Sequence, residues 1–218
     1  MERAPHFRGN NEAVLTPPEL IKRALSNRPT GRVAGDDLTP AAVMVLLYPK
    51  DGEYCVLLNK RSQEVEHHKG EISFPGGATD PEDRNPLDTA LRETEEEMGI
   101  RRDHIDVLGE MDEVATRSRF RVRVFAGTLR QAQGERQAQG HPYEFRPSAD
   151  EIAEIVEFPV KALRDPASLR IETHWQEGVP STVYSYAHDK HLVFGATARI
   201  LQQFLQLLED GLESEGQN

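Results

Sequence analysis

The sequence predicts one domain of the α/β or α+β class, a sandwich of strands and helices, and three observations lead to this prediction. Candidate strands are mixed with a few amphipathic helices along the chain. The chain has 218 residues, a length that favours one domain and allows a sizeable buried core. The longest apolar run, 41–48, is far too short to cross a bilayer, so we expect no membrane-spanning helix.

Two segments carry clear helix-start signals. Thr16 is followed by two prolines and by Glu19, a spacing that predicts a short helix through about residue 27. Asn85 is a good N-cap, and the proline after it suits the first helical position. Gly99 supplies the stop, so the second helix is expected between Asn85 and Gly99.

Apolar periodicity and turn residues predict the remaining elements. In chain order these are a loop over 31–37, a strand over 41–48 buried on both faces, a turn at 50–52, a partner strand over 54–60, a loop over 61–73, strands over 105–110 and 120–129, a mobile loop over 131–140, a strand or short helix over 152–158, a strand over 182–186 and an amphipathic helix over 196–208. The expected organisation is a helix-and-loop extension over 1–36, one domain over 37–210 and a disordered tail over 211–218.

Charge and cysteine usage narrow the function classes. The chain holds 37 acidic and 26 basic residues, a formal net charge of −11, which argues against non-specific binding to nucleic acid or to an anionic membrane. A small anionic substrate is still allowed if cations and a local basic cluster hold it. The lone cysteine, Cys55, excludes an internal disulfide, and no signal-peptide pattern begins the chain. We therefore expect a cytoplasmic protein.

The predicted helix before Gly99 is unusually rich in acid. Glu93, Glu96 and Glu97 fall in one sector at about 100° per residue. Like charges four residues apart destabilise a helix by about 0.2–0.5 kcal/mol, and carboxylates near a helix C-terminus add to this cost. Two interpretations are open: a solvated acidic face, or a site for a hard divalent cation, which prefers oxygen ligands. The glycine turn at 74–77 favours the second, because glycine lets the backbone approach a ligand closely.

Gly77 and the segment 92–100 together resemble the box of the Nudix hydrolase family. The second half, Arg-Glu-Thr-Glu-Glu-Glu-Met-Gly-Ile, matches at its fixed positions except that Thr94 replaces an aliphatic residue. The first half is one residue longer than the pattern and has Arg84 where an acid is expected, so that Asp83 or Glu82 would serve instead. The resemblance implies an α/β/α sandwich with a mixed sheet between helices.

A second signature, over 57–62 with Gly70 and 74–77, resembles that of the coenzyme A pyrophosphatase branch of this family. Asn59 stands where threonine is usual, and Glu66 where a second arginine is usual. Segments 151–154 and 194–198 also resemble this branch. The resemblance implies metal-dependent hydrolysis of the diphosphate bond of coenzyme A, or of its thioesters, to 3′,5′-ADP and 4′-phosphopantetheine.

The same resemblance implies a role for individual residues. Mg²⁺ or Mn²⁺ would be held by Glu93 and Glu97, with Glu96 and the Gly76 carbonyl contributing. The general base would be Glu93 or Glu151, and Arg92 would orient the carboxylates. The basic residues of the signature loop either contact substrate phosphates or pair with acids of the same loop; those proposed for substrate are Arg61, Lys60 and Lys69.

Two other functions are weighed beside this one. Asn59 and Glu66 motivate a Nudix pyrophosphatase that acts on ADP-ribose, NADH or another nucleoside diphosphate derivative. A non-catalytic, nucleotide-binding regulator of Nudix type is the third, although such a domain should have lost acids of the box. In each case the expected partner is a small molecule, not nucleic acid or membrane, and the chain is expected to be a monomer or a homodimer.

Overall fold

The computed structural model describes residues 15–26, 28–35, 37–63, 69–130, 143–176 and 178–213. Its strands are β1 (Thr39–Lys50), β2 (Glu53–Arg61), β3 (Ile72–Ser73), β4 (Gly76–Ala78), β5 (Ile105–Ala115), β6 (Phe120–Leu129), β7 (Ile152–Pro159), β8 (Leu169–Gln176), β9 (Val179–His188) and β10 (His191–Val193). Its helices are α1 (Pro17–Ser26), α2 (Pro86–Met98), α3 (Val160–Leu163) and α4 (Gly195–Glu213), with 3₁₀ turns η1 (Arg102–His104) and η2 (Pro166–Ser168).

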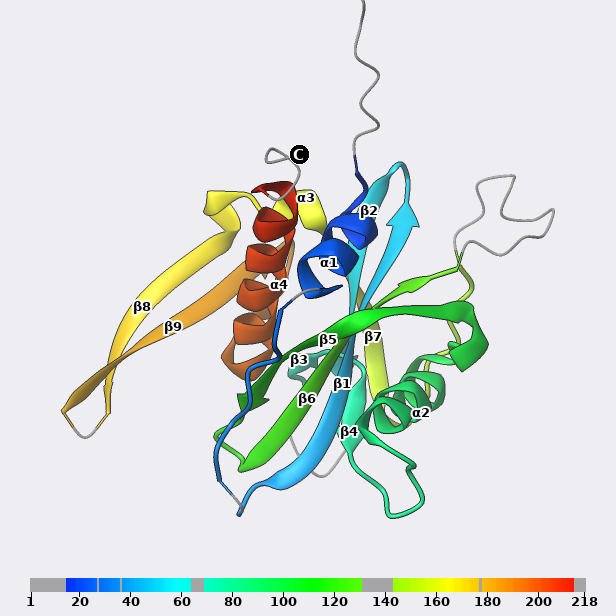
Figure 1. Cartoon of the computed structure of the whole chain (residues 1–218), viewed down its shortest axis with the longest axis horizontal. Helices are drawn as coiled ribbons and strands as arrows, with labels where there is room; N and C mark the ends of the chain where they lie inside the picture. Colours follow the sequence, from blue (N-terminus) through cyan, green and yellow to red (C-terminus); the bar gives the residue numbers. More distant parts are fainter. Residues whose placement is uncertain are drawn as a thin grey trace, which may run out of the picture.

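In the described residues, a mixed seven-stranded sheet lies between helices (Figure 1). The strand order is β3-β2-β1-β6-β5, with β4 also paired to β1 and β7 to β2. β1 runs parallel to β6 and antiparallel to β2 and β4. α2 covers one face of the sheet, and α1 and α4 cover the other. The predicted α/β/α sandwich with a mixed sheet is therefore confirmed.

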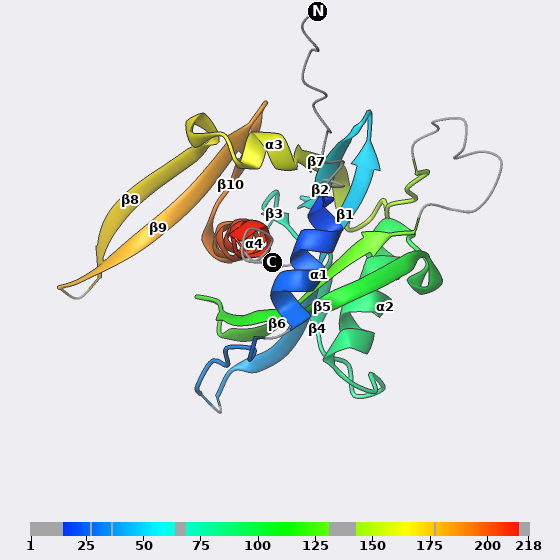
Figure 2. The same cartoon turned by 45° about the horizontal axis from the view of Figure 1, so that its top comes forward.

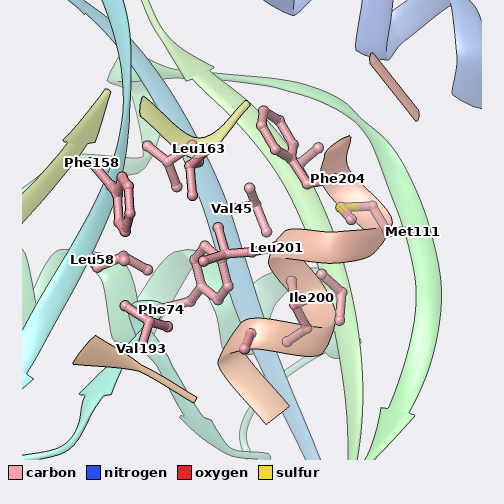
Figure 3. Packing of buried hydrophobic residues seen from close by; sticks show 14 of the residues in the cluster. Val45, Leu58, Phe74, Met111, Phe158, Leu163, Val193, Ile200, Leu201 and Phe204 are labelled. Carbon is pink, nitrogen blue, oxygen red and sulfur yellow. The ribbon is translucent and has the colours of Figure 1, made fainter. Parts of the chain in front are cut away.

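β1 is buried on both faces, as its continuous apolar sequence predicts. Met44 and Leu46 pack in the cluster that α2 covers. Val45 and Leu47 belong to the cluster that contains residues of α1 and α4. Figure 3 shows Val45 among the side chains of this second cluster, with Leu201 of α4 close by. Strand alternation thus divides one apolar run between two cores.

The two terminal helices pack against each other at a glycine. A Cβ added to Gly211 of α4 would lie 2.6 Å from the carbonyl oxygen of Leu20 in α1, so glycine allows the close approach. α4 continues past this contact to Glu213. It extends beyond the predicted helix end near 208 and into the segment that we expected to be a disordered tail. Residues 214–218 lie outside the described residues. The predicted domain boundaries stay a prediction.

Several other elements differ from the sequence-based expectations. Residues 152–158 form a strand, β7, which pairs antiparallel with β2. The expected loop over 61–73 ends in the short strand β3, and the unpredicted strand β8 extends β9 into a hairpin. Most β8 side chains are exposed, so the segment carries little of the buried alternation by which strands are predicted. The expected mobile loop over 131–140 lies outside the described residues. Among those that are described, no helix is long and apolar enough to span a membrane.

A buried tyrosine makes stability sensitive to alkaline pH. Tyr186 of β9 is fully buried, and its hydroxyl donates a hydrogen bond to Gln202 Oε1 at 2.8 Å. Burial, with Tyr184 adding to it, raises the pKa of Tyr186 from 10.0 to about 12. Between these values the unfolded chain loses the proton while the folded chain keeps it. We expect the free energy of unfolding to fall by about 2–3 kcal/mol over this range.

Urea denaturation of the wild-type chain and Tyr186→Phe at several pH values tests this expectation. The phenylalanine variant should lose that part of the pH dependence, because it has no proton to release. Identical pH profiles for the two proteins would contradict the assignment to Tyr186.

Candidate active site

The acid-rich helix α2 begins and ends where its sequence signals predict. The Asn85 side chain accepts a hydrogen bond from the Asp88 N–H at 3.0 Å, and Gly99 ends the helix in the left-handed conformation. Thr94, the departure from an aliphatic position, is buried but donates to the Ala90 carbonyl at 2.6 Å. The helix thus buries Thr94 without leaving its hydroxyl unpaired.

The strand that precedes α2, β4, has no free space for a side chain at either of its two glycines. Gly76 and Gly77 lie in β4, opposite Val43 and Ala42 of β1. A Cβ on Gly76 would collide with the β1 backbone, and the φ of 150° there is itself unfavourable for other residues. A Cβ on Gly77 would lie 2.6 Å from the carboxyl carbon of Glu93. The bare backbone therefore brings β4 directly against the carboxylates of α2.

Glu97 is the most enclosed of these carboxylates, with its side chain 2% exposed. Its Oε2 accepts hydrogen bonds from Asn59 Nδ2 at 2.8 Å and from the Gly76 N–H at 3.1 Å. Its Oε1 accepts one from Arg61 Nη1 at 3.2 Å. Burial nevertheless raises the pKa of Glu97 to about 7, with Glu93 and Glu151 adding to the rise and the Gly76 N–H and Arg61 opposing it. Three donors do not compensate for the loss of water.

Glu151 is brought to this cluster by the backbone around it. The N–H groups of Arg146 and Ser148 donate to the carbonyls of Met98 and Glu97, the last residues of α2. Glu151 follows directly, and its own carbonyl accepts from the Ser62 N–H at 2.7 Å. Its carboxylate is close enough to raise the pKa of both Glu93 and Glu97. The structure therefore places Glu151 beside the acids of α2, although it is distant in sequence.

Arg92 organises the acidic face of α2. Its Nε and Nη2 form a two-point contact with Asp83 at 2.9 and 3.0 Å. Its Nη1 donates to Glu93 Oε1 at 2.8 Å and to Glu96 Oε2 at 2.9 Å. Thr89 also donates to Asp83, at 2.8 Å. Asp83 thus fixes Arg92, which in turn holds the two glutamates.

The three basic residues proposed for substrate lie in different surroundings. Arg61 is 25% exposed and contacts Glu97, so it belongs to the site. Lys60 is two residues after Leu58 in β2 and therefore lies on the same face, which packs on the core that contains residues of α4. Asn59 lies on the opposite face. Lys69 is exposed, next to Gly70, whose N–H donates to the Arg61 carbonyl at 3.2 Å. Glu66 lies outside the described residues. The substrate roles of Lys60 and Lys69 stay predictions.

A family model described as a NUDIX domain matches residues 38–176. The chain belongs to the Nudix family. Its relatives include NudL, a Nudix hydrolase of Photorhabdus laumondii, 30% identical over 183 residues that cover 83% of this chain and 91% of the relative. The mouse mitochondrial coenzyme A diphosphatase NUDT8 is 33% identical over 192 residues, which cover 87% of each chain. A MutT/nudix family protein from Enterococcus faecalis aligns with a TM-score of 0.47 and 18% identity, over 81% of this chain and 64% of that one.

The structure shows what two departures from the Nudix signatures contact. Of the two residues expected to replace the first acid, Asp83 binds Arg92 directly, and its role as that acid stays a prediction. Asn59 has no direct contact with solvent and serves as a donor to Glu97. Sequence reasoning missed this role and the Arg61–Glu97 pair, because neither follows from spacing along the chain. The fold brings these residues together only through the pairing of β2, β4 and α2.

Nudix hydrolases generally use divalent metal ions, and the oxygen donors of this site suit such an ion. Glu93, Glu96 and Glu97 lie on one helix beside the Gly76 backbone. The burial that raises the pKa of Glu93 and Glu97 is the kind of cost that a bound cation relieves. No group of three His, Cys, Asp or Glu side chains among the described residues is already gathered as a metal cluster. In this structure the arginines at 61 and 92 are the positive partners of these carboxylates.

The Asn59 amide is expected to matter for hydrolysis although it is fully buried. It donates to Glu97 and accepts from Ser73 Oγ at 2.7 Å, so both of its ends are fixed. Removing a partner that orients a metal-binding side chain typically costs 10–100-fold in metal affinity or activity. We therefore expect Asn59→Ala to lose activity by about 10–100-fold and to need more Mg²⁺ for half-maximal rate.

Asn59→Thr is the matched variant, because threonine keeps one hydroxyl donor and is the residue usual in the signature. It should retain more activity than the alanine variant. Steady-state rates over a Mg²⁺ titration would measure both. Wild-type metal dependence in Asn59→Ala would show that the amide does not position Glu97.

Proposed function

We propose that this Nudix hydrolase cleaves the diphosphate bond of coenzyme A, giving 3′,5′-ADP and 4′-phosphopantetheine. One observation carries the proposal: residues of the coenzyme A signature and of the Nudix box meet at a single carboxylate. Arg61 and Gly76 come from that signature, and both donate to Glu97 of the box. The similarity to mouse NUDT8 over 87% of each chain supports the same substrate.

The reaction requires charge neutralisation, because the phosphates of a diphosphate ester repel an attacking hydroxide. Mg²⁺ or Mn²⁺ would neutralise that charge and lower the pKa of a bound water. Glu93 and Glu97 would be the principal ligands, with Glu96 and the Gly76 carbonyl contributing. Arg92 contacts Glu93 and Glu96 directly, so its task is to hold these two carboxylates in place.

A base near the metal-binding acids must accept the proton of the attacking water. Glu93 and Glu151 are both candidates, since each lies within the group of interacting carboxylates. Arg61, whose side chain is partly exposed, would contact a substrate phosphate through its guanidinium, a group suited to bidentate phosphate binding. Lys69 would add positive charge from the same loop.

Asn59 gives no reason to prefer another substrate. Its side chain is enclosed and faces Glu97, so its replacement of threonine changes the support of the site. Retention of Glu93, Glu96 and Glu97 favours an enzyme over a non-catalytic regulator. The predicted cytoplasmic location is kept as part of the proposal, although the printed name of the mouse relative places that protein in mitochondria.

Product analysis tests the proposed reaction. The protein is incubated with coenzyme A, acetyl-coenzyme A, ADP-ribose or NADH, each with Mg²⁺ and with Mn²⁺, and the products are separated and weighed by mass spectrometry. We expect 3′,5′-ADP and 4′-phosphopantetheine from coenzyme A, and a higher kcat/KM for it or its thioester than for the others. Preferential hydrolysis of ADP-ribose or NADH would overturn the substrate while leaving the Nudix chemistry in place.

A further inference from the structure

The β8–β9 hairpin extends past the body of the molecule. It belongs to a separate sheet with the order β10-β9-β8, so β8 is an edge strand. Figures 1 and 2 both show the hairpin running beyond α4, with β8 on the outer side. No described strand pairs with the outer edge of β8. An open edge of this kind is a template for pairing with another strand.

Two large apolar side chains of β8 are exposed to solvent. Ile171 is 61% exposed and Trp175 is 71% exposed. Both lie on the same face of β8 as Leu169, which is paired with the buried Tyr186 of β9. The face that begins in the core beside α4 therefore continues outward as an uncovered apolar surface. Such exposure on an edge strand is characteristic of an interaction site.

The sequence of β8 is complementary to itself in one antiparallel register. When two copies pair about Thr173, Ile171 of one lies opposite the partner's Trp175. In the same register Glu172, which already contacts His174 of its own strand at 3.0 Å, lies opposite the partner's His174. A two-fold axis repeats each pair, so apolar side chains meet apolar ones and an acid meets a histidine twice. We propose that this chain forms a homodimer by antiparallel pairing of β8 with β8 of a second copy, centred on Thr173.

The registers centred one and two residues before Thr173 are less complementary. Centring the pair on Glu172 would place two carboxylates directly opposite each other, which is destabilising. Centring it on Ile171 would leave Trp175 opposite Ala167, which lies beyond the strand in η2. The Thr173 register alone among these three pairs the two exposed apolar side chains with each other.

Pairing in this register also explains the length of the hairpin. An isolated two-stranded hairpin is marginally stable in water, and the outer half of this one has little else to pack on. Antiparallel pairing lays the outer end of one β8 beside the inner end of the other. Trp175 then lies beside the start of the partner's β8, which packs on the core of that copy through Leu169. The two three-stranded sheets become one continuous sheet.

Sedimentation of the full chain at micromolar concentration is the first test. We expect a mass twice that of one chain for the wild type, and a single-chain mass for Trp175→Glu. Val179→Glu is the matched control: Val179 is 65% exposed but lies on β9, so this variant should remain dimeric. A monomeric wild type, or a Trp175→Glu variant that stays dimeric, would overturn the proposal.

Cysteine crosslinking tests the register in a chain that keeps Trp175. Thr173→Cys should form an intermolecular disulfide on mild oxidation, because residue 173 lies opposite its own copy. Ser181→Cys on β9 should not crosslink, since three strand spacings, about 14 Å, would separate the two copies. The native Cys55 is buried. Crosslinking of Ile171→Cys in place of Thr173→Cys, or of Ser181→Cys as readily as Thr173→Cys, would overturn the proposed pairing.

Discussion

Replacing Glu97 by glutamine is expected to lower the rate of the proposed coenzyme A hydrolysis by about 10²–10³-fold, the loss typical when one charge-stabilising group is removed from an active site. The amide keeps the size of the carboxylate and one oxygen that can accept from Asn59 and the Gly76 N–H. It loses the negative charge, and its nitrogen cannot accept the hydrogen bond from Arg61. Steady-state kinetics at saturating Mg²⁺ would measure the loss of kcat.

The same substitution should leave the fold intact or make it more stable in the absence of metal. Glu97 is a buried carboxylate near Glu93 and Glu151, so its charge costs free energy in the folded state. Sites built for function often carry such a cost. Glu95→Gln is the matched control, because Glu95 points away from the cluster toward Arg102. If both variants lost activity equally, the effect would reflect general damage to α2 and not the role of Glu97.

Much of this architecture follows from local sequence signals. Asn85 and Gly99 delimit α2 because capping is decided by a few neighbouring residues. The strand over 41–48 is recognisable because an unbroken apolar run must be covered on both sides. The acids of α2 are likewise visible in the sequence, since helical spacing alone puts Glu93, Glu96 and Glu97 in one sector.

What surrounds those acids depends on pairing between distant segments. Arg61 contacts Glu97 because β2 and β4 both pair with β1, on which α2 packs. Glu151 reaches the site because the backbone at 146–148 binds the last carbonyls of α2. Residues adjacent in sequence can also be separated by the fold. Lys60 follows Asn59 directly but faces the other side of the sheet. Sequence spacing predicts faces within an element but not which elements meet.

Gly77→Ala is expected to lower hydrolysis by about 100-fold with little effect on stability. The new methyl group would lie 2.6 Å from the carboxyl carbon of Glu93, which must then move, and a displacement of about 1 Å in an active site can cost this much. The adjacent Gly76→Ala should behave differently. Its methyl group would meet the backbone of β1, so it should lower the melting temperature and unfold the site along with the sheet.

The Glu93 side chain can move away from a new methyl group at position 77. A second substitution can therefore test whether the Gly77 effect acts through Glu93. Shortening the displaced acid should relieve the clash, so Glu93→Asp should cost less activity in the Gly77→Ala background than in the wild type. Gly52→Ala, in the β1–β2 turn with no atom within 4 Å of the new Cβ, controls for a glycine replacement far from the site. Its φ of 81° is unfavourable for alanine, so this variant should lose some stability but keep its activity while folded. Melting curves and kinetics of these variants would separate steric displacement of Glu93 from loss of fold. Additive losses in the double variant would mean that Gly77 does not act through Glu93.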